Sequence, residues 1–239
     1  MIRLMVFDLD NTLAELGKGI VGEDLILLKK IENLGVDIAV CSGKPTYYLC
    51  GFMRQVGLKR PILVGENGAV IQFGVDLPPR EFYVLPYSED AKNTLSFLKK
   101  KIEEVLPDIW FQPNLAGVTP FPATKEEFDT ITKCLEEEKE KIRDIEIYRH
   151  CNSFDLVPRG INKKSGMQAL GELLDIKPEE TIAIGDGVND YPMFEYAGFS
   201  AGVNVADETR VNINFHTSTE MLRFLLKMAE DQKEQKHGI

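Results

Sequence analysis

The sequence of 239 residues has few of the features that mark zinc sites, disulfide scaffolds or nucleic-acid surfaces. Its four cysteines form no CxxC pair and no compact framework, so neither a zinc site nor a disulfide-stabilised fold is expected. The three histidines, His150, His216 and His237, lack metal-ligand spacing. Lys and Arg number 28 against 38 Asp and Glu, and the net charge of -10 argues against nucleic acid as a partner.

Long apolar stretches and targeting signals are also missing. No segment reaches membrane-spanning length, and no secretory signal peptide is visible, because the chain runs at once into a strand-like segment. We therefore expect a soluble, cytoplasmic protein with no membrane partner. No GxGxxG motif follows the first strand, which disfavours a dinucleotide-binding domain. The hydrophobic content of 44% is sufficient for a sizeable core in one domain or two.

The first expected strand, Ile2 to Asp10, carries an apolar run without alternation, which is typical of a strand buried on both faces of a parallel sheet. Side chains two apart on a strand share a face, so Asp8 and Asp10 should project together from its carboxyl end. Carboxylates beside a core are costly unless paired, and a hard cation such as Mg2+ would suit them. The alternative is an Asx turn that closes the strand.

The flanking segments alternate between strands and helices, which predicts βαβ units and a parallel sheet. Ligands bind at the carboxyl ends of such strands. Gly65 to Phe73 is expected to form a hairpin, because Asn67-Gly68 suits a type I′ turn. The expected helices are 23–34, 46–56, 164–174 and one after Thr217, with a polar tail from Asp231 that is expected to fray; the expected strands are 36–40, 62–64, 181–184 and 199–205.

The middle of the chain does not follow the alternation of single strands and helices. After Pro78 the pattern predicts helix, two strands, helix and two strands, an αββαββ module with its own antiparallel sheet and with helices on one face. The fold class is therefore predicted as α/β, with a doubly wound, Rossmann-like parallel-sheet core and an inserted smaller α+β domain. Residues 1–80 and 160–239 are assigned to the core and residues 81–159 to the insertion.

Four motifs follow one another along the core segments. They are DLDNT at Asp8 to Thr12, CSGK at Cys41 to Lys44, NK at Asn162 and Lys163, and GDGVND at Gly185 to Asp190. This ordered set resembles the haloacid dehalogenase superfamily of phosphotransferases. The GENGAV hairpin and the position of the inserted module are similar to the Cof-type branch with a subclass IIB-like cap domain, and so to phosphoglycolate and sugar-phosphate phosphatases.

The resemblance implies a role for each acidic residue. Asp8 matches the family nucleophile, which attacks phosphorus and forms an aspartyl-phosphate. Asp10 matches the general acid and base. The family places Mg2+ between the Asp8 carboxylate, the main-chain carbonyl of Asp10 and the Asp186 carboxylate. Asp190 is expected to bind the ion directly or through water, and Asn189 to orient that shell and contribute to substrate binding.

The resemblance also implies residues that hold the phosphoryl group. Ser42, through its hydroxyl, and the Gly43 amide match the family's phosphate-binding positions, although Ser42 could instead be a helix N-cap. Lys163 is expected to place an ammonium beside the nucleophile and the phosphate. Lys164 is adjacent, but family spacing selects Lys163. Lys44 stands where relatives commonly carry Arg, which weakens any bidentate phosphate contact there.

Three functions are consistent with this set of motifs. The leading hypothesis is a Mg2+-dependent phosphomonoesterase that hydrolyses a small phosphorylated metabolite, a sugar phosphate or phosphoglycolate, through an aspartyl-phosphate. The alternative is a phosphomutase of the phosphomannomutase type, which would require a bisphosphorylated activator. A third possibility, from another class, is a phospho-receiver or metabolite-binding module without turnover. The expected oligomeric state is a monomer or a homodimer.

Overall fold

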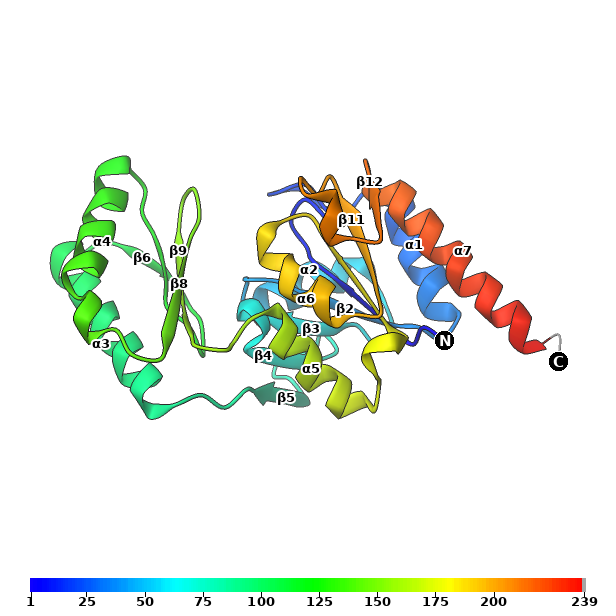
Figure 1. The fold of residues 1–239 in the computed structure, drawn as a ribbon, viewed down its shortest axis with the longest axis horizontal. Coiled ribbons are helices and arrows are strands. Elements are labelled where there is room, and N and C mark those ends of the chain that lie inside the picture. The colour runs from blue at the N-terminus through cyan, green and yellow to red at the C-terminus, as the bar shows by residue number, and fades with distance from the viewer. Residues whose placement is uncertain (238–239) are drawn as a thin grey trace. The chain divides into compact units, whose positions relative to one another are not determined.

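The computed structural model describes residues 1–237. The chain forms two compact units, which are labelled by element in Figure 1. The first unit combines Met1–Tyr83 with Asn162–Ile239, and the second is Val84–Ile161. Within the described residues, no helix is both long enough and apolar enough to cross a membrane.

An eight-stranded sheet forms the centre of the first unit, in the order β12-β11-β10-β1-β2-β3-β4-β5. The strands from β12 to β3 are parallel to their neighbours, and β4 is antiparallel to β3. This arrangement confirms the doubly wound α/β core. The strand bounds are β1 Leu4–Phe7, β2 Asp37–Cys41, β3 Ile62–Gly65, β4 Val70–Phe73, β5 Glu81–Val84, β10 Thr181–Gly185, β11 Phe199–Val203 and β12 Ile213–Phe215.

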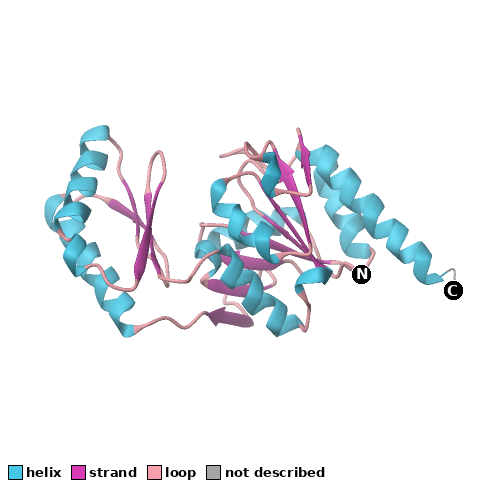
Figure 2. Cartoon of the chain, in the orientation of Figure 1, coloured by secondary structure: helices cyan, strands magenta, loops and turns pink. Residues whose placement is uncertain are grey.

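Helices cover both faces of this sheet (Figures 1 and 2). Met5 and Phe7 of β1 belong to one buried hydrophobic cluster with side chains of α1, α2 and α7. Side chains alternate along a strand, so the equally buried Leu4 and Val6 point to the opposite face. On the sheet, α5 contacts β4, and α6 contacts β10 and β11. The helix bounds are α1 Gly22–Asn33, α2 Thr46–Val56, α5 Lys163–Leu174, α6 Tyr191–Tyr196 and α7 Ser218–His237.

Several boundaries differ from those predicted. β1 ends at Phe7, whereas a strand through Asp10 was expected, because the chain turns at Asn11, where φ is 60°. The predicted fraying from Asp231 is wrong up to His237, since α7 continues to that residue. The last two predicted tail residues lie outside the described part of the chain. β5, β12 and α6 were not predicted.

The β3–β4 hairpin was predicted from Asn67-Gly68, and it is present. Both central residues of its turn have positive φ, 56° for Asn67 and 105° for Gly68, as a type I′ turn requires. The Ala69 N–H donates to the Glu66 carbonyl at 3.2 Å and closes the turn.

The second unit has the predicted order of helix, two strands, helix and two strands. Its elements are α3 Glu89–Val105, β6 Trp110–Gln112, β7 Thr119–Phe121, α4 Lys125–Glu137, β8 Ile145–Arg149 and β9 Phe154–Pro158. The helices share a hydrophobic cluster with the strands. A single antiparallel sheet was expected, but the structure has two hairpins, β6–β7 and β8–β9. A bridge between Val118 and Leu156 joins the two hairpins, and the Thr119 hydroxyl of β7 donates to Asp155 Oδ1 of β9 at 2.9 Å.

Candidate active site

Three neighbouring parallel strands end at the same edge of the sheet with polar residues. β1 lies between β2 and β10, and Asp8, Ser42 and Asp186 directly follow these three strands. Along the chain, strands are added first on the β2 side of β1 and later on its β10 side, so the strand order reverses at β1. This edge is therefore the topological switch point of the sheet. Ligands bind at such a point in open α/β sheets.

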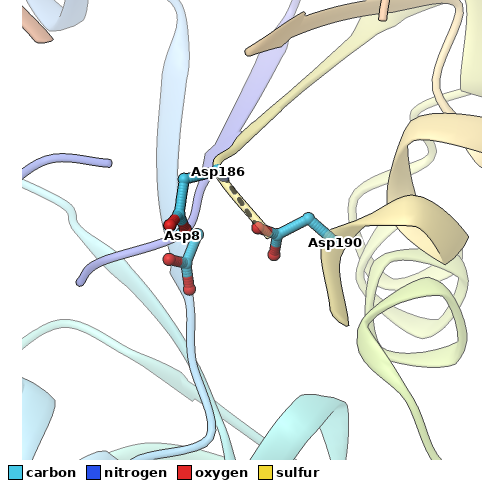
Figure 3. Close-up of side chains that lie close together, drawn as sticks. All are labelled: Asp8, Asp186 and Asp190. Atoms are coloured by element: carbon cyan, nitrogen blue, oxygen red, sulfur yellow. Dashed lines mark hydrogen bonds between the residues drawn. The ribbon is translucent and has the colours of Figure 1, made fainter. Parts of the chain in front are cut away.

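Asp8, Asp186 and Asp190 form a carboxylate cluster at this edge (Figure 3). One carboxylate oxygen from each lies within 4.8 Å of the others. Lys163, the first residue of α5, is 1% exposed, and its Nζ lies 2.5 Å from Asp8 Oδ1 and 2.5 Å from Asp190 Oδ1. Lys164 is only half-buried. The structure therefore brings one ammonium into contact with two buried carboxylates.

Asp190 also fixes the loop that carries Asp186. Its Oδ2 accepts hydrogen bonds from the backbone N–H groups of Asp186, at 2.9 Å, and Gly187, at 3.0 Å. A Cβ at Gly185 would lie 2.3 Å from the same oxygen, so glycine is required there for the carboxylate to approach the backbone. Both oxygens of Asp190 are thus bound within the protein, one by this loop and one by Lys163.

The cluster and Lys163 together hold three carboxylates and one ammonium, so the negative charges exceed the positive charge. Burial, reinforced by the carboxylate of Asp190 and opposed by Lys163, raises the pKa of Asp8 to about 7. Burial and Asp190 also raise the pKa of Asp186. Burial would lower the pKa of Lys163, but Asp190 and Asp8 outweigh it and raise this pKa, so the lysine keeps its proton. Three carboxylates facing one ammonium fit a divalent cation that prefers oxygen ligands.

Thr12 is a site residue that was not predicted from the sequence. The residue is 1% exposed, and its Oγ1 lies 3.5 Å from Asp8 Oδ2 and 3.4 Å from Asp186 Oδ1. A hydroxyl has one proton, so Thr12 donates to one carboxylate at a time and sits between the two. Its position in DLDNT could have indicated a role in the site. An uncharged residue in a turn, however, does not by itself predict which groups its side chain contacts.

Asp10 is not one of the three residues that form the carboxylate cluster. The Asn11 N–H donates to the Ala14 carbonyl at 2.6 Å in the turn after β1, and strand alternation therefore stops before Asp10. The Asp10 carboxylate instead contacts the Lys44 ammonium.

The other predicted substrate-binding positions differ in burial. Ser42 is 3% exposed, and its Oγ accepts from the Lys44 N–H at 3.3 Å. It is not the N-cap of α2, because that position is Pro45. Gly43, next to Ser42, is half-buried, and the Asn189 side chain is exposed.

The loop after β2 is bound to the turn of the β3–β4 hairpin. The Asn67 N–H donates to the Ser42 carbonyl at 3.0 Å, and the Glu66 N–H donates to the Lys44 carbonyl at 3.0 Å. A Cβ at Gly65 would lie 2.9 Å from the same Lys44 oxygen. The hairpin turn therefore fixes the backbone that carries Ser42 and Gly43.

The same hairpin turn contacts the start of α5. A Cβ at Gly68 would lie 2.3 Å from the Asn162 carbonyl oxygen, and a Cβ at Gly166 would lie 2.6 Å from the Gly68 Cα. Asn162 is the N-cap of α5 and immediately precedes Lys163. The turn thus links the Ser42 loop to the helix that presents the buried lysine.

Replacing Gly68 with alanine is expected to lower the free energy of unfolding by about 2–4 kcal/mol, because the new Cβ meets backbone and the residue has positive φ. Gly74→Ala is the matched control, since Gly74 has a φ of +76° and nothing within 4 Å of a built Cβ. It should cost only about 1–2 kcal/mol. Urea unfolding followed by circular dichroism measures both, and equal losses would contradict the tight contact at α5.

Comparison with known proteins identifies what this chain is similar to. The family model of the haloacid dehalogenase-like hydrolases matches residues 5–76 and 80–220. A phosphoglycolate phosphatase of Metallosphaera sedula is 33% identical over 215 residues, covering 87% of each chain. A phosphoglycolate phosphatase of Nitrosopumilus maritimus is 28% identical over 236 residues, covering 95% of this chain and 96% of the relative.

Solved structures share the fold. A haloacid dehalogenase-like hydrolase from Bacteroides thetaiotaomicron superposes with a TM-score of 0.77 at 19% identity, covering 95% of this chain and 100% of the other. A sugar phosphatase described as subclass IIB of the same superfamily gives a TM-score of 0.65 at 19% identity, covering 94% of this chain and 99% of the other.

Proposed function

Because the chain belongs to the haloacid dehalogenase-like hydrolases, in their Cof-type branch, and is a phosphatase, we propose that it is a Mg2+-dependent phosphomonoesterase acting through an aspartyl-phosphate. Its proposed substrate is a small phosphorylated metabolite, phosphoglycolate or a sugar phosphate. Two relatives are named phosphoglycolate phosphatase, and one similar structure is a sugar phosphatase.

The observation that carries this proposal is the placement of Asp8. Its carboxylate is buried at the switch point of the sheet, 2.5 Å from the Lys163 ammonium and in one cluster with Asp186. Anionic oxygens of a phosphate monoester repel an attacking carboxylate, so attack requires fixed positive charge and alignment. Lys163 supplies such a charge, and the hairpin turn holds the Ser42 loop on the neighbouring strand.

The proposed reaction uses residues of this chain in two steps. A carboxylate oxygen of Asp8 forms a bond to phosphorus as the bond between phosphorus and the leaving oxygen breaks, and Asp10 gives that oxygen its proton. In the second step Asp10 takes a proton from water, the water oxygen bonds to phosphorus, and the Asp8 carboxylate is released with inorganic phosphate. The Ser42 hydroxyl and the Gly43 amide donate to phosphoryl oxygens in both steps.

A metal ion is part of the proposal. Asp8 and Asp186 would hold it with the Asp10 main-chain carbonyl, and Asp190 would bind it directly or through water. The Asp190 oxygens also accept from backbone N–H groups and from Lys163. A bound Mg2+ supplies positive charge against the phosphoryl oxygens and keeps neighbouring carboxylates ionised. That effect matters for Asp8, whose pKa of about 7 would otherwise leave part of it protonated at neutral pH.

The second unit, Val84–Ile161, is proposed as the cap domain. Its order of helix, two strands, helix and two strands is the αββαββ pattern of the subclass IIB type. Domains of this kind exclude water and contact the part of a substrate that leaves.

Phosphate release from a panel of monoesters tests the proposal. The panel holds 2-phosphoglycolate, hexose phosphates and p-nitrophenyl phosphate, each with MgCl2 and with EDTA. We expect release from at least one alkyl phosphate that stops on addition of EDTA. Folded protein that releases no phosphate from any of them would overturn the proposal, and isomerisation that needs a bisphosphorylated activator would favour the phosphomutase.

Mg2+ is expected to raise the melting temperature by several degrees at about pH 8 and by less at about pH 5. The pKa of Asp8 in the folded protein, about 7, lies above its ordinary value of 3.8, so the native state favours the protonated form. The stability that Asp8 contributes is therefore present below about pH 4 and is lost as the pH rises through about 7. Mg2+ offsets this loss only where Asp8 is ionised.

Differential scanning fluorimetry at constant ionic strength measures this effect. Asp186→Asn is the comparison variant, because it removes one proposed ligand at nearly constant volume, and it should reduce the Mg2+-dependent gain. A gain of equal size at both pH values, and in this variant, would contradict a metal site at the cluster.

A further inference from the structure

Lys44 contacts Asp10 through their charged groups. Its Nζ contacts Asp10 Oδ2, and the side chains are 26% and 24% exposed. Lys44 lies in the loop after β2, and Asp10 lies in the turn after β1, so the two come from neighbouring strands. The DLD segment has two carboxylates, and Asp8 belongs to the cluster with Asp186 and Asp190. The Lys44 ammonium contacts the other one, Asp10.

The Lys44 backbone is held on both sides. Its N–H donates to Ser42 Oγ at 3.3 Å, and its carbonyl accepts from the Glu66 N–H at 3.0 Å. The Lys44 Nζ also lies 5.5 Å from the centre of the ring of Tyr48, which is in the first turn of α2. A cation near an aromatic ring is attracted to the negative face of the ring. The backbone of Lys44 is therefore fixed, and its ammonium has a second favourable contact besides Asp10. Together these restrict the positions that the ammonium can take.

We propose that Lys44 is a positioning residue for Asp10 and not a ligand of the phosphoryl group. This inference rests on the proposed function. By donating to Oδ2, Lys44 fixes the Asp10 carboxyl and leaves Oδ1 to exchange the proton. As the bond between phosphorus and the leaving oxygen breaks, the proton passes from Asp10 to that oxygen. Asp10 later recovers a proton from the water that releases phosphate from Asp8.

The dependence of the rate on the leaving group separates positioning from phosphate binding. The phenolate of p-nitrophenyl phosphate leaves without protonation, whereas the alkoxide of 2-phosphoglycolate or of a sugar phosphate needs a proton. The value of kcat/KM reports the steps up to departure of the leaving group. Lys44→Met is therefore expected to lower kcat/KM about 10- to 100-fold for the best alkyl phosphate and less than about 3-fold for p-nitrophenyl phosphate.

Inhibition by inorganic phosphate gives a binding readout that does not depend on proton transfer. In Lys44→Met its inhibition constant should change less than about 2-fold, because the phosphoryl ligands are untouched. Lys44→Arg, which keeps a cation, should recover most of the alkyl phosphate activity. Lys30→Met, on the exposed face of α1, is the control for loss of a lysine. Thermal melting shows that each variant is folded.

A double-mutant cycle with Asp10→Asn completes the test. Asp10→Asn alone should severely reduce alkyl phosphate turnover, and adding Lys44→Met should cause no further loss if Lys44 acts through Asp10. Equal losses on aryl and alkyl phosphates with weaker phosphate inhibition, or additive losses in the cycle, would overturn the inference and make Lys44 a phosphate ligand. Absence of phosphate release by the wild-type protein would instead overturn the proposed function itself.

Discussion

Asp8→Asn is expected to reduce phosphate release by at least about 10⁴-fold, because the amide cannot attack phosphorus. The replacement keeps nearly the same volume at a residue that is 6% exposed. Lys163 keeps its contact with Asp190, so the ammonium stays paired. The loss should therefore come from chemistry and not from disruption of the fold.

Stability should move in the opposite direction to activity. Since burial raises the pKa of Asp8 to about 7, its ionised form costs stability in the metal-free protein above that pH. Asp8→Asn removes this charge, so without Mg2+ at about pH 8 its melting temperature should equal or exceed that of the wild type. Asp129→Asn, at an exposed position of α4, serves as the matched control. Retained turnover in a folded Asp8→Asn protein would exclude Asp8 as the nucleophile.

Lys163→Met is expected to lower the free energy of unfolding by about 3–5 kcal/mol and to abolish turnover. The lysine is 1% exposed and lies 2.5 Å from carboxylate oxygens of both Asp8 and Asp190. Its removal leaves two buried carboxylates without their cation, and methionine fills the space without supplying charge. Urea unfolding at about pH 8 measures the stability change, and phosphate release measures the activity.

The neighbouring lysine provides the control for this prediction. Lys164 is half-buried and next in the chain, so Lys164→Met should change the free energy of unfolding by less than about 0.5 kcal/mol. If Lys163→Met is too unstable to assay, the double variant Lys163→Met with Asp190→Asn removes charge from both partners and should recover part of the stability. Equal costs at Lys163 and Lys164 would contradict the assignment of the buried ammonium to Lys163.

Segments with strong local signals could be predicted from the sequence. The helix predicted over Thr46–Val56 has those bounds in the structure, because its apolar stripe is followed by Gly57, which adopts the left-handed conformation that ends a helix. The strand expected at 181–184 is β10, since its apolar run is followed directly by the glycines of GDGVND. The positions of Asp8 and Asp186 at strand ends followed from these elements.

Features that depend on tertiary contacts could not be predicted. β5 and β12 have only four and three residues and are partly exposed, so each gives a weak local signal, and their pairing with a neighbouring strand defines them. The direction of the Asp10 side chain depends on the turn at Asn11, and its contact with Lys44 joins segments of two separate strands. The contact of Gly68 with α5 likewise required the folded arrangement.

Because β1 lies between β2 and β10 in the sheet, its two edges find their partner strands at different times during synthesis of the chain. Leu4 pairs with Asp37 on one side and with Thr181 on the other, so one edge of β1 has no partner until the ribosome has made β10. At roughly 5–20 residues per second this interval lasts on the order of 10 s. An exposed strand edge can pair with other chains during such a delay. Nascent chains that stop before Thr181 would therefore be inactive and prone to aggregate.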